Sequence, residues 1–253
     1  MNRFLAAIRF LTVVPVPGTG GTAPADLAGS VPFFPVVGLL LGAAAAALAW
    51  GLARVAPPLV AAAALLIAMM GFSGCLHLDG LSDTADGFLS CRDRPRMLEI
   101  MRDSHAGAMG LIAVIAVLLL KFAALASLAS LAPASLWPAA GLMPLAGRVA
   151  ICVHLALLPP ARPDGLGAIF CRQRHVAAAI SALALLAVVA AVLLGPARGL
   201  VLAAACLAVT LLLAAYVYRK LGGATGDTLG AACEIVEVVP ALGLALWPLD
   251  LVR

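Results

Sequence analysis

The chain alternates long apolar runs with short polar segments over its whole length. A membrane-spanning helix needs about 20 mostly apolar residues to cross the hydrocarbon layer of a bilayer. Runs of this kind cover residues 36–55, 59–75, 111–131, 136–158, 176–194, 200–218 and 235–252. The pattern predicts an all-α protein, a polytopic integral membrane helical bundle of about seven transmembrane helices with polar cytoplasmic loops.

The composition supports a lipid environment. Hydrophobic residues make up 64% of the 253 residues and charged residues only 11%, with a mean hydropathy of +1.12. Soluble domains carry about 25% charged residues, so a soluble core is excluded. Aromatic residues are scarce, and the many small residues favour close helix packing over a membrane barrel.

Charge and cysteine usage exclude several classes of function. The net charge of +4 comes from basic residues in short loops, where the positive-inside rule explains them, so we expect no nucleic-acid partner. The six cysteines are scattered without a C-x-x-C pair, which indicates neither a disulfide framework nor a zinc site. Residues 3–14, interrupted by Arg9 and ended by Pro15 and Pro17, predict a short helix at the membrane surface rather than a cleaved signal.

The distribution of basic residues orients the predicted spans. With the N-terminus in the cytoplasm, eleven basic residues fall in cytoplasmic segments: Arg3, Arg9, Arg92, Arg94, Arg96, Arg102, Arg162, Arg172, Arg174, Arg219 and Lys220. Only Arg54, Arg198 and Arg253 fall on the other side. Lys121 and Arg148 lie inside predicted spans, where a charge needs a partner or a watery cavity unless it snorkels to the interface.

A polar segment at residues 74–110, the first island, interrupts the apolar pattern. Asp79, Asp83 and Asp86 follow a spacing of i, i+4 and i+7, which places them within about 60° of one another on a helix face. Three carboxylates at such short range repel, and a divalent cation removes that cost. Clustered aspartates suit Mg²⁺ or Mn²⁺, which bridge carboxylates to substrate phosphates. The first island therefore predicts a metal-dependent diphosphate site.

A shorter polar segment at residues 222–228, the second island, repeats this chemistry. Asp227 and Glu234 are seven residues apart, and Glu237 follows three residues later. An alternative interpretation is that Asp227 and Thr228 cap a helix N-terminus, where both residue types are favoured.

Other polar residues of the first island are candidates for substrate contacts. Its arginines could clamp phosphate oxygens or only fix topology, and Arg102, beside Asp103 and Ser104, is the strongest phosphate candidate. His77 is a candidate base or metal ligand, with a structural hydrogen-bonding role as the alternative.

Several stretches resemble the cobalamin synthase family, also called adenosylcobinamide-GDP ribazoletransferase. They are Phe10-Leu11-Thr12 with Pro15-Val16-Pro17, residues 34–42, His77-Leu78-Asp79-Gly80-Leu81-Ser82-Asp83-Thr84-Ala85-Asp86-Gly87, residues 94–104 with Gly107 and Gly110, and residues 221–231 with Glu234. They run in order over nearly the full length. The chain departs from the family pattern at Val13, where we expect an arginine, and residues 159–175 match mainly at Gly165, Gly167 and Phe170.

The resemblance implies a multi-pass enzyme of the cell inner membrane with its active site facing the cytoplasm. It would transfer the adenosylcobinamide phosphate group from adenosylcobinamide-GDP to α-ribazole or its 5′-phosphate and release GMP, a late step of coenzyme B12 biosynthesis. We expect one transmembrane catalytic domain, residues 1–253, with active-site segments 74–110 and 219–237. A homo-oligomer and contacts with other B12-assembly enzymes are left open as partners.

The resemblance also suggests a role for each candidate residue. Mg²⁺ is the expected cofactor, with Asp79, Asp83, Asp227 and Glu234 as its ligands. Arg102, Arg96, Ser104 and Thr228 are expected at the substrate phosphates. Asp86 or Asp103 would accept the hydroxyl proton, with His77 as a further catalytic candidate.

Two other functions remain alternatives at this stage. A CDP-alcohol-type membrane phosphotransferase also uses clustered aspartates, although the Ala-Arg expected after Asp-Gly-x-x is absent here. A cation transporter would place such acids near the bilayer midplane, at broken helices.

Overall fold

A computed structural model describes residues 1–171 and 173–249, and within these ranges the chain forms helices and no named strand. The prediction of an all-α bundle is confirmed. The elements in chain order are α1 (Asn2–Leu11), α2 (Pro24–Ala28), η1 (Val31–Phe33), α3 (Phe34–Val55), α4 (Pro58–Phe72), α5 (Leu76–Leu89), α6 (Arg94–Ile100), α7 (Ala108–Leu131), α8 (Pro133–Leu157), α9 (Leu166–Cys171), α10 (Val176–Leu194), α11 (Pro196–Leu221) and α12 (Gly226–Leu246).

The number of long apolar helices agrees with the expected seven spans. Within the described ranges, six helices are long and apolar enough to cross a membrane, and a seventh span results if α4 and α5 are taken together. This pair is bent by 88° at its break. The predicted run 59–75 therefore ends early, because Gly74 and Cys75 adopt positive φ angles of 58° and 60° that stop the helix after Phe72.

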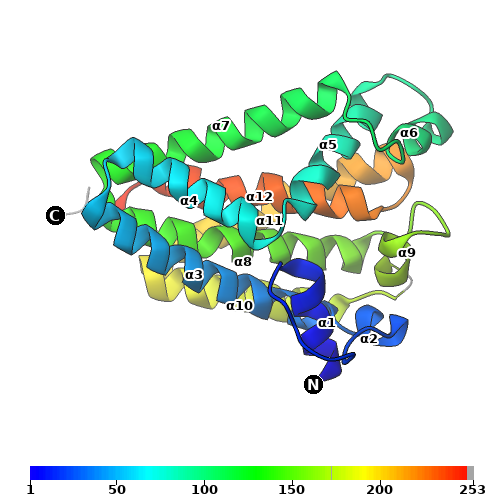
Figure 1. Cartoon of the computed structure of the whole chain (residues 1–253), viewed down its shortest axis with the longest axis horizontal. Coiled ribbons are helices and arrows are strands. Elements are labelled where there is room, and N and C mark those ends of the chain that lie inside the picture. Colours follow the sequence, from blue (N-terminus) through cyan, green and yellow to red (C-terminus); the bar gives the residue numbers. More distant parts are fainter. Residues whose placement is uncertain (172, 250–253) are drawn as a thin grey trace.

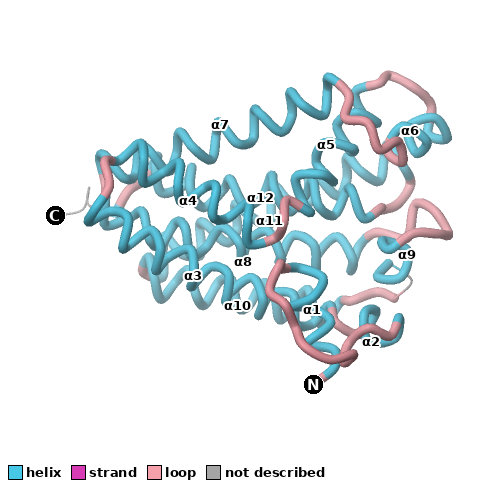
Figure 2. Tube along the Cα trace, viewed as in Figure 1, coloured by secondary structure: helices cyan, strands magenta, loops and turns pink. Residues whose placement is uncertain are grey.

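The long helices lie side by side along the longest axis of the molecule (Figure 1). The short helices α1, α2, α6 and α9, together with α5, gather at one end of this bundle. The loops connect the helices mainly at the two ends, as the pink segments of Figure 2 show. Both islands and the loop after α8 therefore lie at the same end, as the sequence predicts, and α1 confirms the short N-terminal helix.

Helix α8 forms the centre of the bundle and is buried over most of its length. Gly38 and Gly42 of α3 lie against it, and a Cβ atom at Gly38 would stand only 2.9 Å from the carbonyl oxygen of Pro144. At Gly42 the backbone of Gly141 is closer still. Small residues four apart let the two backbones approach, which is a common way of packing helices in membranes.

The last helix begins earlier than predicted. The apolar pattern predicts a span over residues 235–252, whereas α12 starts at Gly226 and includes the last three residues of the second island. The reason is a capping box. Thr225 accepts a hydrogen bond from the Thr228 amide, and the Thr228 hydroxyl accepts one from the Thr225 amide. Residues 250–252 of the predicted span, and Arg172 and Arg253 from the charge count, lie outside the described residues.

Candidate active site

The site is built where α5 and α12 cross with almost no space between their backbones. A Cβ atom at Gly80 would lie 2.8 Å from the carbonyl oxygen of Asp227, and one at Gly230 would lie 3.1 Å from that of His77. Glycine at both positions therefore permits a contact that any side chain would open. The crossing joins the two islands through Gly80 and Gly230, which lie 150 residues apart in the sequence.

The crossing brings the carboxylates of the two islands together. Asp79 and Asp227 line the same cavity. Asp79, Asp86 and Asp227 are all near enough to Asp83 to act on its charge. Among the described residues, no three histidine, cysteine, aspartate or glutamate side chains are close enough to form a complete metal cluster. The structure provides two carboxylates at one cavity, Asp79 and Asp227, with the carboxylate of Asp83 nearby.

A basic residue from a third segment lies beside this pair. Arg162 forms an ion pair of 3.3 Å with Asp227, and the two side chains are only 17% and 22% exposed. Its second terminal nitrogen, Nη1, is buried without a hydrogen-bond partner. Burying an unpaired guanidinium nitrogen costs free energy, and a bound anion would remove that cost. Nη1 of Arg162 is therefore a free donor for an oxygen of such an anion.

Backbone pairing holds Arg162 at this place. Pro160 and Ala224 form a parallel bridge, in which Ala161 donates to the Ala224 carbonyl at 2.8 Å and Ala224 donates to the Pro159 carbonyl at 2.8 Å. Residues 159–165, the Arg162 loop, are thereby attached directly to the second island. The sequence has no motif in this loop, and the prediction of site residues does not include Arg162.

The cavity itself has a volume of about 240 Å³ and a mixed lining. His77, Asp79, Arg162 and Asp227 are its polar or charged side chains. Three phenylalanines, Phe10, Phe34 and Phe170, form the aromatic part of the lining. Their ring centroids are 5.0 Å apart for Phe10 and Phe170, 5.6 Å for Phe34 and Phe170, and 6.0 Å for Phe10 and Phe34. The predicted site residues do not include these rings, although Phe10, Phe34 and Phe170 fall in stretches that resemble the family.

Two of the predicted site residues form caps at helix N-termini. Asp86 accepts hydrogen bonds of 2.8 Å from the amides of Gly107 and Gly110, so both its oxygens serve the first turn of α7. Thr228 is fully buried in the capping box of α12. Thr228 therefore has the capping role that was the alternative interpretation of the second island. Asp227, in the same turn, lines the cavity.

Other candidates lie on the exposed surface of the first island. Arg96 pairs with Glu99 at 2.7 Å, and Ser104 is exposed. Asp103 pairs with His105 at 2.7 Å, and the backbone amide and imidazole of His105 hold the pKa of Asp103 below its usual value. None of these side chains lines the cavity.

Arg102 contacts the Arg162 loop instead of standing free. Its guanidinium donates to both carboxylate oxygens of Asp164 at 2.7 Å. Arg94 reinforces the same junction through bonds of 2.6 Å and 2.7 Å to the carbonyls of Leu221 and Ala161. These two arginines tie α6 and the loop after it to the Arg162 loop and the end of α11.

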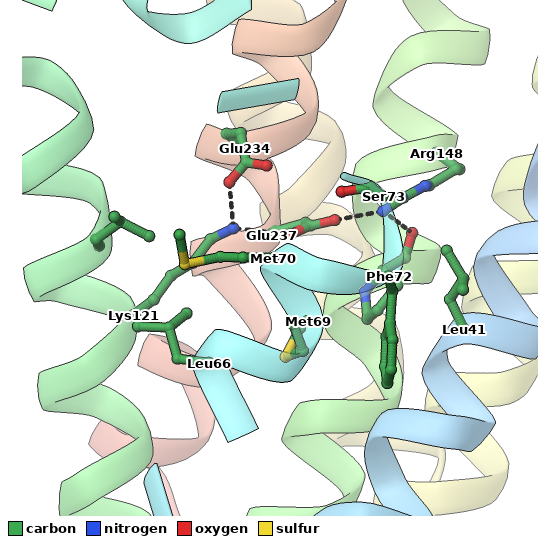
Figure 3. A pocket seen from close by; sticks show the side chains of 12 residues that line it. Leu41, Leu66, Met69, Met70, Phe72, Ser73, Lys121, Arg148, Glu234 and Glu237 are labelled. Carbon is green, nitrogen blue, oxygen red and sulfur yellow. Dashed lines mark hydrogen bonds and ion pairs between the residues drawn. The ribbon is translucent and has the colours of Figure 1, made fainter. Parts of the chain in front are cut away.

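Glu234 lies in a separate, buried cluster of charges between the helices (Figure 3). Lys121 donates to Glu234 at 2.6 Å and to Glu237 at 2.7 Å, and Arg148 donates to Glu237 at 2.5 Å. We call these four residues the charge quartet. It supplies the partners that the sequence predicts Lys121 and Arg148 to need, and it places the Glu234 carboxylate on an ammonium group rather than beside Asp227.

Comparisons with known proteins all indicate the same family. The family model described as cobalamin-5-phosphate synthase matches residues 3–245. A protein of Roseiflexus sp. (strain RS-1) is 43% identical over 165 residues, 65% of this chain and 60% of the relative. Relatives from Acetivibrio thermocellus (39%; 67% of this chain, 68% of the relative) and Thiobacillus denitrificans (37%; 77% and 83%) are similar as well.

All three relatives carry the name adenosylcobinamide-GDP ribazoletransferase. The chain thus spans about three fifths of the length of the Roseiflexus relative in that match. No solved structure matches the chain. These matches support the interpretation as a ribazoletransferase over the CDP-alcohol and transporter alternatives.

Proposed function

The chain belongs to the cobalamin-5-phosphate synthase family, and we propose that it transfers the adenosylcobinamide phosphate group from adenosylcobinamide-GDP to α-ribazole or α-ribazole 5′-phosphate. The products are adenosylcobalamin, or its 5′-phosphate, and GMP. The observation that carries the proposal is the meeting of Asp79, Asp227 and Arg162 at one cavity, which combines metal-binding oxygens with a donor for phosphate.

We propose Mg²⁺ as the cofactor, held by Asp79 and Asp227 with Asp83 beside them. The donors are all carboxylate oxygens, which Mg²⁺ prefers, and this ion is usually held by one or two carboxylates together with substrate phosphates. The pair therefore fits Mg²⁺ without a complete protein cage. When bound, the ion would neutralise charge on the diphosphate oxygens. Glu234 is omitted from the proposed ligands because its carboxylate pairs with Lys121.

The remaining residues position and neutralise the reacting groups. Arg162 keeps its contact with Asp227 through Nη2 and donates from its unpaired Nη1 to an oxygen of the diphosphate. A ribose hydroxyl of the acceptor attacks the phosphorus nearer the cobinamide, and the bond from that phosphorus to the GMP oxygen breaks. Of the three catalytic candidates only His77 lines the cavity, so we assign it to receive the hydroxyl proton. Asp86 shapes the site as a cap of α7.

We also propose that the protein resides in the cell inner membrane with its island-bearing end in the cytoplasm. The excess of basic residues in the segments at that end supports this orientation. Assembly with a second copy or with other B12-assembly enzymes stays a prediction.

The direct test is turnover by the purified protein in lipid, supplied with adenosylcobinamide-GDP and α-ribazole with and without Mg²⁺. We expect GMP and the corrinoid product in equal amounts, and only when Mg²⁺ is present. GMP release without a corrinoid product would indicate a hydrolase, and no turnover under any of these conditions would refute the proposal.

A further inference from the structure

The cavity has more apolar surface than phosphoryl transfer requires. A diphosphate and its metal need charges and hydrogen-bond donors, which Asp79, Asp227 and Arg162 provide. Phe10, Phe34, Phe170 and Ile151 contribute no such groups, yet they line the same space. The cavity therefore suits a ligand with two parts: an apolar part that contacts the phenylalanines and a polar part that contacts the charged residues.

The aromatic wall is assembled from three separate parts of the chain. Phe10 comes from α1, Phe34 from the start of α3 and Phe170 from α9. Phe34 and Phe170 are each only 1% exposed, whereas Phe10 is partly exposed. Phe10 packs on both buried rings and lines the cavity, so it is the ring of the three with the most surface available to a ligand.

Helix α9 is fixed against the polar half of the site. A Cβ atom at Gly167 would collide with the backbone of Thr225 and Gly226 at the start of α12. This contact places Phe170, one turn further along α9, beside the start of α12, which carries Asp227. Phe170 and Asp227 therefore line the same cavity.

The size of the cavity limits what can enter. Its volume of about 240 Å³ lies below the roughly 300–1,000 Å³ of pockets for drug-sized ligands. A corrin macrocycle does not fit. A lipid chain would fill the apolar part but would leave the buried Nη1 of Arg162 without a hydrogen-bond partner, which is costly. A flat aromatic ring system attached to a hydroxylated sugar satisfies both halves.

We propose that this cavity is the base-binding site of a nucleoside substrate, with the planar base stacked on Phe10 and the sugar turned toward Asp79 and Asp227. Bases stack on aromatic side chains whatever their identity, since every base has a π face. The inference rests on the proposed function, in which two substrates carry a base: the α-ribazole acceptor and the guanine of the donor.

The test measures binding of α-ribazole and of GMP separately, by equilibrium dialysis with the full chain in lipid nanodiscs. Phe10→Leu keeps an apolar side chain but removes the ring, and we expect it to weaken the binding of one of the two ligands about tenfold and leave the other unchanged. Phe10→Trp restores a flat face and should restore that affinity. Loss of α-ribazole assigns the site to the acceptor, and loss of GMP assigns it to the donor.

Phe4→Leu is the matched control, because Phe4 lies on the same helix and packs on Phe33 at 5.7 Å without lining the cavity. Unchanged affinities in Phe10→Leu would overturn the base site, and so would equal losses in Phe4→Leu and Phe10→Leu or an equal loss of both ligands. Wild-type turnover is measured in the same preparation. Normal turnover with unchanged affinities would refute only the base site, whereas absent turnover would refute the proposed function.

Discussion

At the scale of single residues, the contact that Arg102 makes in the structure differs from the one that the sequence predicts. The sequence places it next to Asp103 and Ser104 and suggests a direct phosphate ligand. In the structure its guanidinium holds Asp164, two residues after Arg162, with both partners about half exposed. An exposed ion pair contributes little stability, on the order of 0–1 kcal/mol. Its value lies in fixing the loop that carries Arg162.

A charge swap separates positioning from direct contact. We expect Arg102→Asp to lower kcat/KM, because two acids then face each other and the Arg162 loop moves away. The double variant Arg102→Asp/Asp164→Arg restores the pair in reverse and should recover most of the loss in a steady-state assay of GMP release. If Arg102 itself binds the diphosphate, the double variant stays as impaired as the single one.

At the scale of elements, the contact of α5 with α12 decides whether the two islands form one site. We expect Gly80→Ala to separate the helices, because its methyl group would stand 2.8–3.0 Å from the Asp227 backbone, which is closer than real Cβ atoms approach. Both the thermal midpoint and kcat/KM should fall.

Gly71→Ala provides the control for the same substitution in a neighbouring helix. A Cβ atom there meets nothing within 4 Å, and alanine is favoured over glycine by about 0.5–1 kcal/mol inside a helix. Its stability should stay equal or rise, with activity unchanged. A Gly80→Ala enzyme as stable and active as Gly71→Ala would contradict the close crossing.

The charge quartet is the second feature that acts between elements. It joins α7, α8 and α12 through Lys121, Arg148, Glu234 and Glu237, all of them buried. Removing one member of a buried pair leaves the other charge uncompensated, at a cost of about 3–5 kcal/mol, whereas replacing both with apolar or neutral groups can be nearly neutral.

We therefore predict that Lys121→Met lowers the thermal midpoint strongly and that Lys121→Met/Glu234→Gln recovers part of the loss. Differential scanning fluorimetry in the same detergent and lipid measures both. Equal stability of the single variant and the wild type would show that Lys121 is not buried among these partners.

At the scale of the whole molecule, the orientation in the membrane determines which side supplies the substrates. Among the described cysteines only Cys75 and Cys91 are exposed, and Cys91 lies in the first island. In a Cys75→Ser background, a membrane-impermeant maleimide should label inside-out vesicles and spare intact spheroplasts. Cys75→Ser/Cys91→Ser measures the background. Labelling of spheroplasts would place the island outside the cytoplasm.

Some parts of the fold can be predicted from the sequence and others cannot, for different physical reasons. Apolar runs are local signals, so the spans and the helix carrying Asp79 and Asp83 could be predicted. The 88° bend after α4 could not, because the apolar pattern continues through the residues where the backbone turns. The start of α12 was obscured because a polar capping box precedes its apolar part.

The long-range contacts of the site lay largely beyond sequence reasoning. Lys121 inside an apolar run signalled that a partner was needed, but its two glutamates lie 113 and 116 residues away. Arg162 sits in a loop with no recognisable motif, and long-range contacts place it in the cavity: the backbone bridge to the second island and the bonds from Arg94 and Arg102 to its loop. Pairings of this kind depend on the packing of whole helices, and no local pattern encodes them.

We propose that carboxylates from α5 and α12 act as one unit on the substrate diphosphate. A double-mutant cycle of Asp79→Asn and Asp227→Asn on kcat/KM tests it most directly, since groups that act together are strongly non-additive. Each single variant should lose most of the activity, and the double variant should lose little more. Losses that multiply, as for independent sites, would contradict a shared site at this cavity.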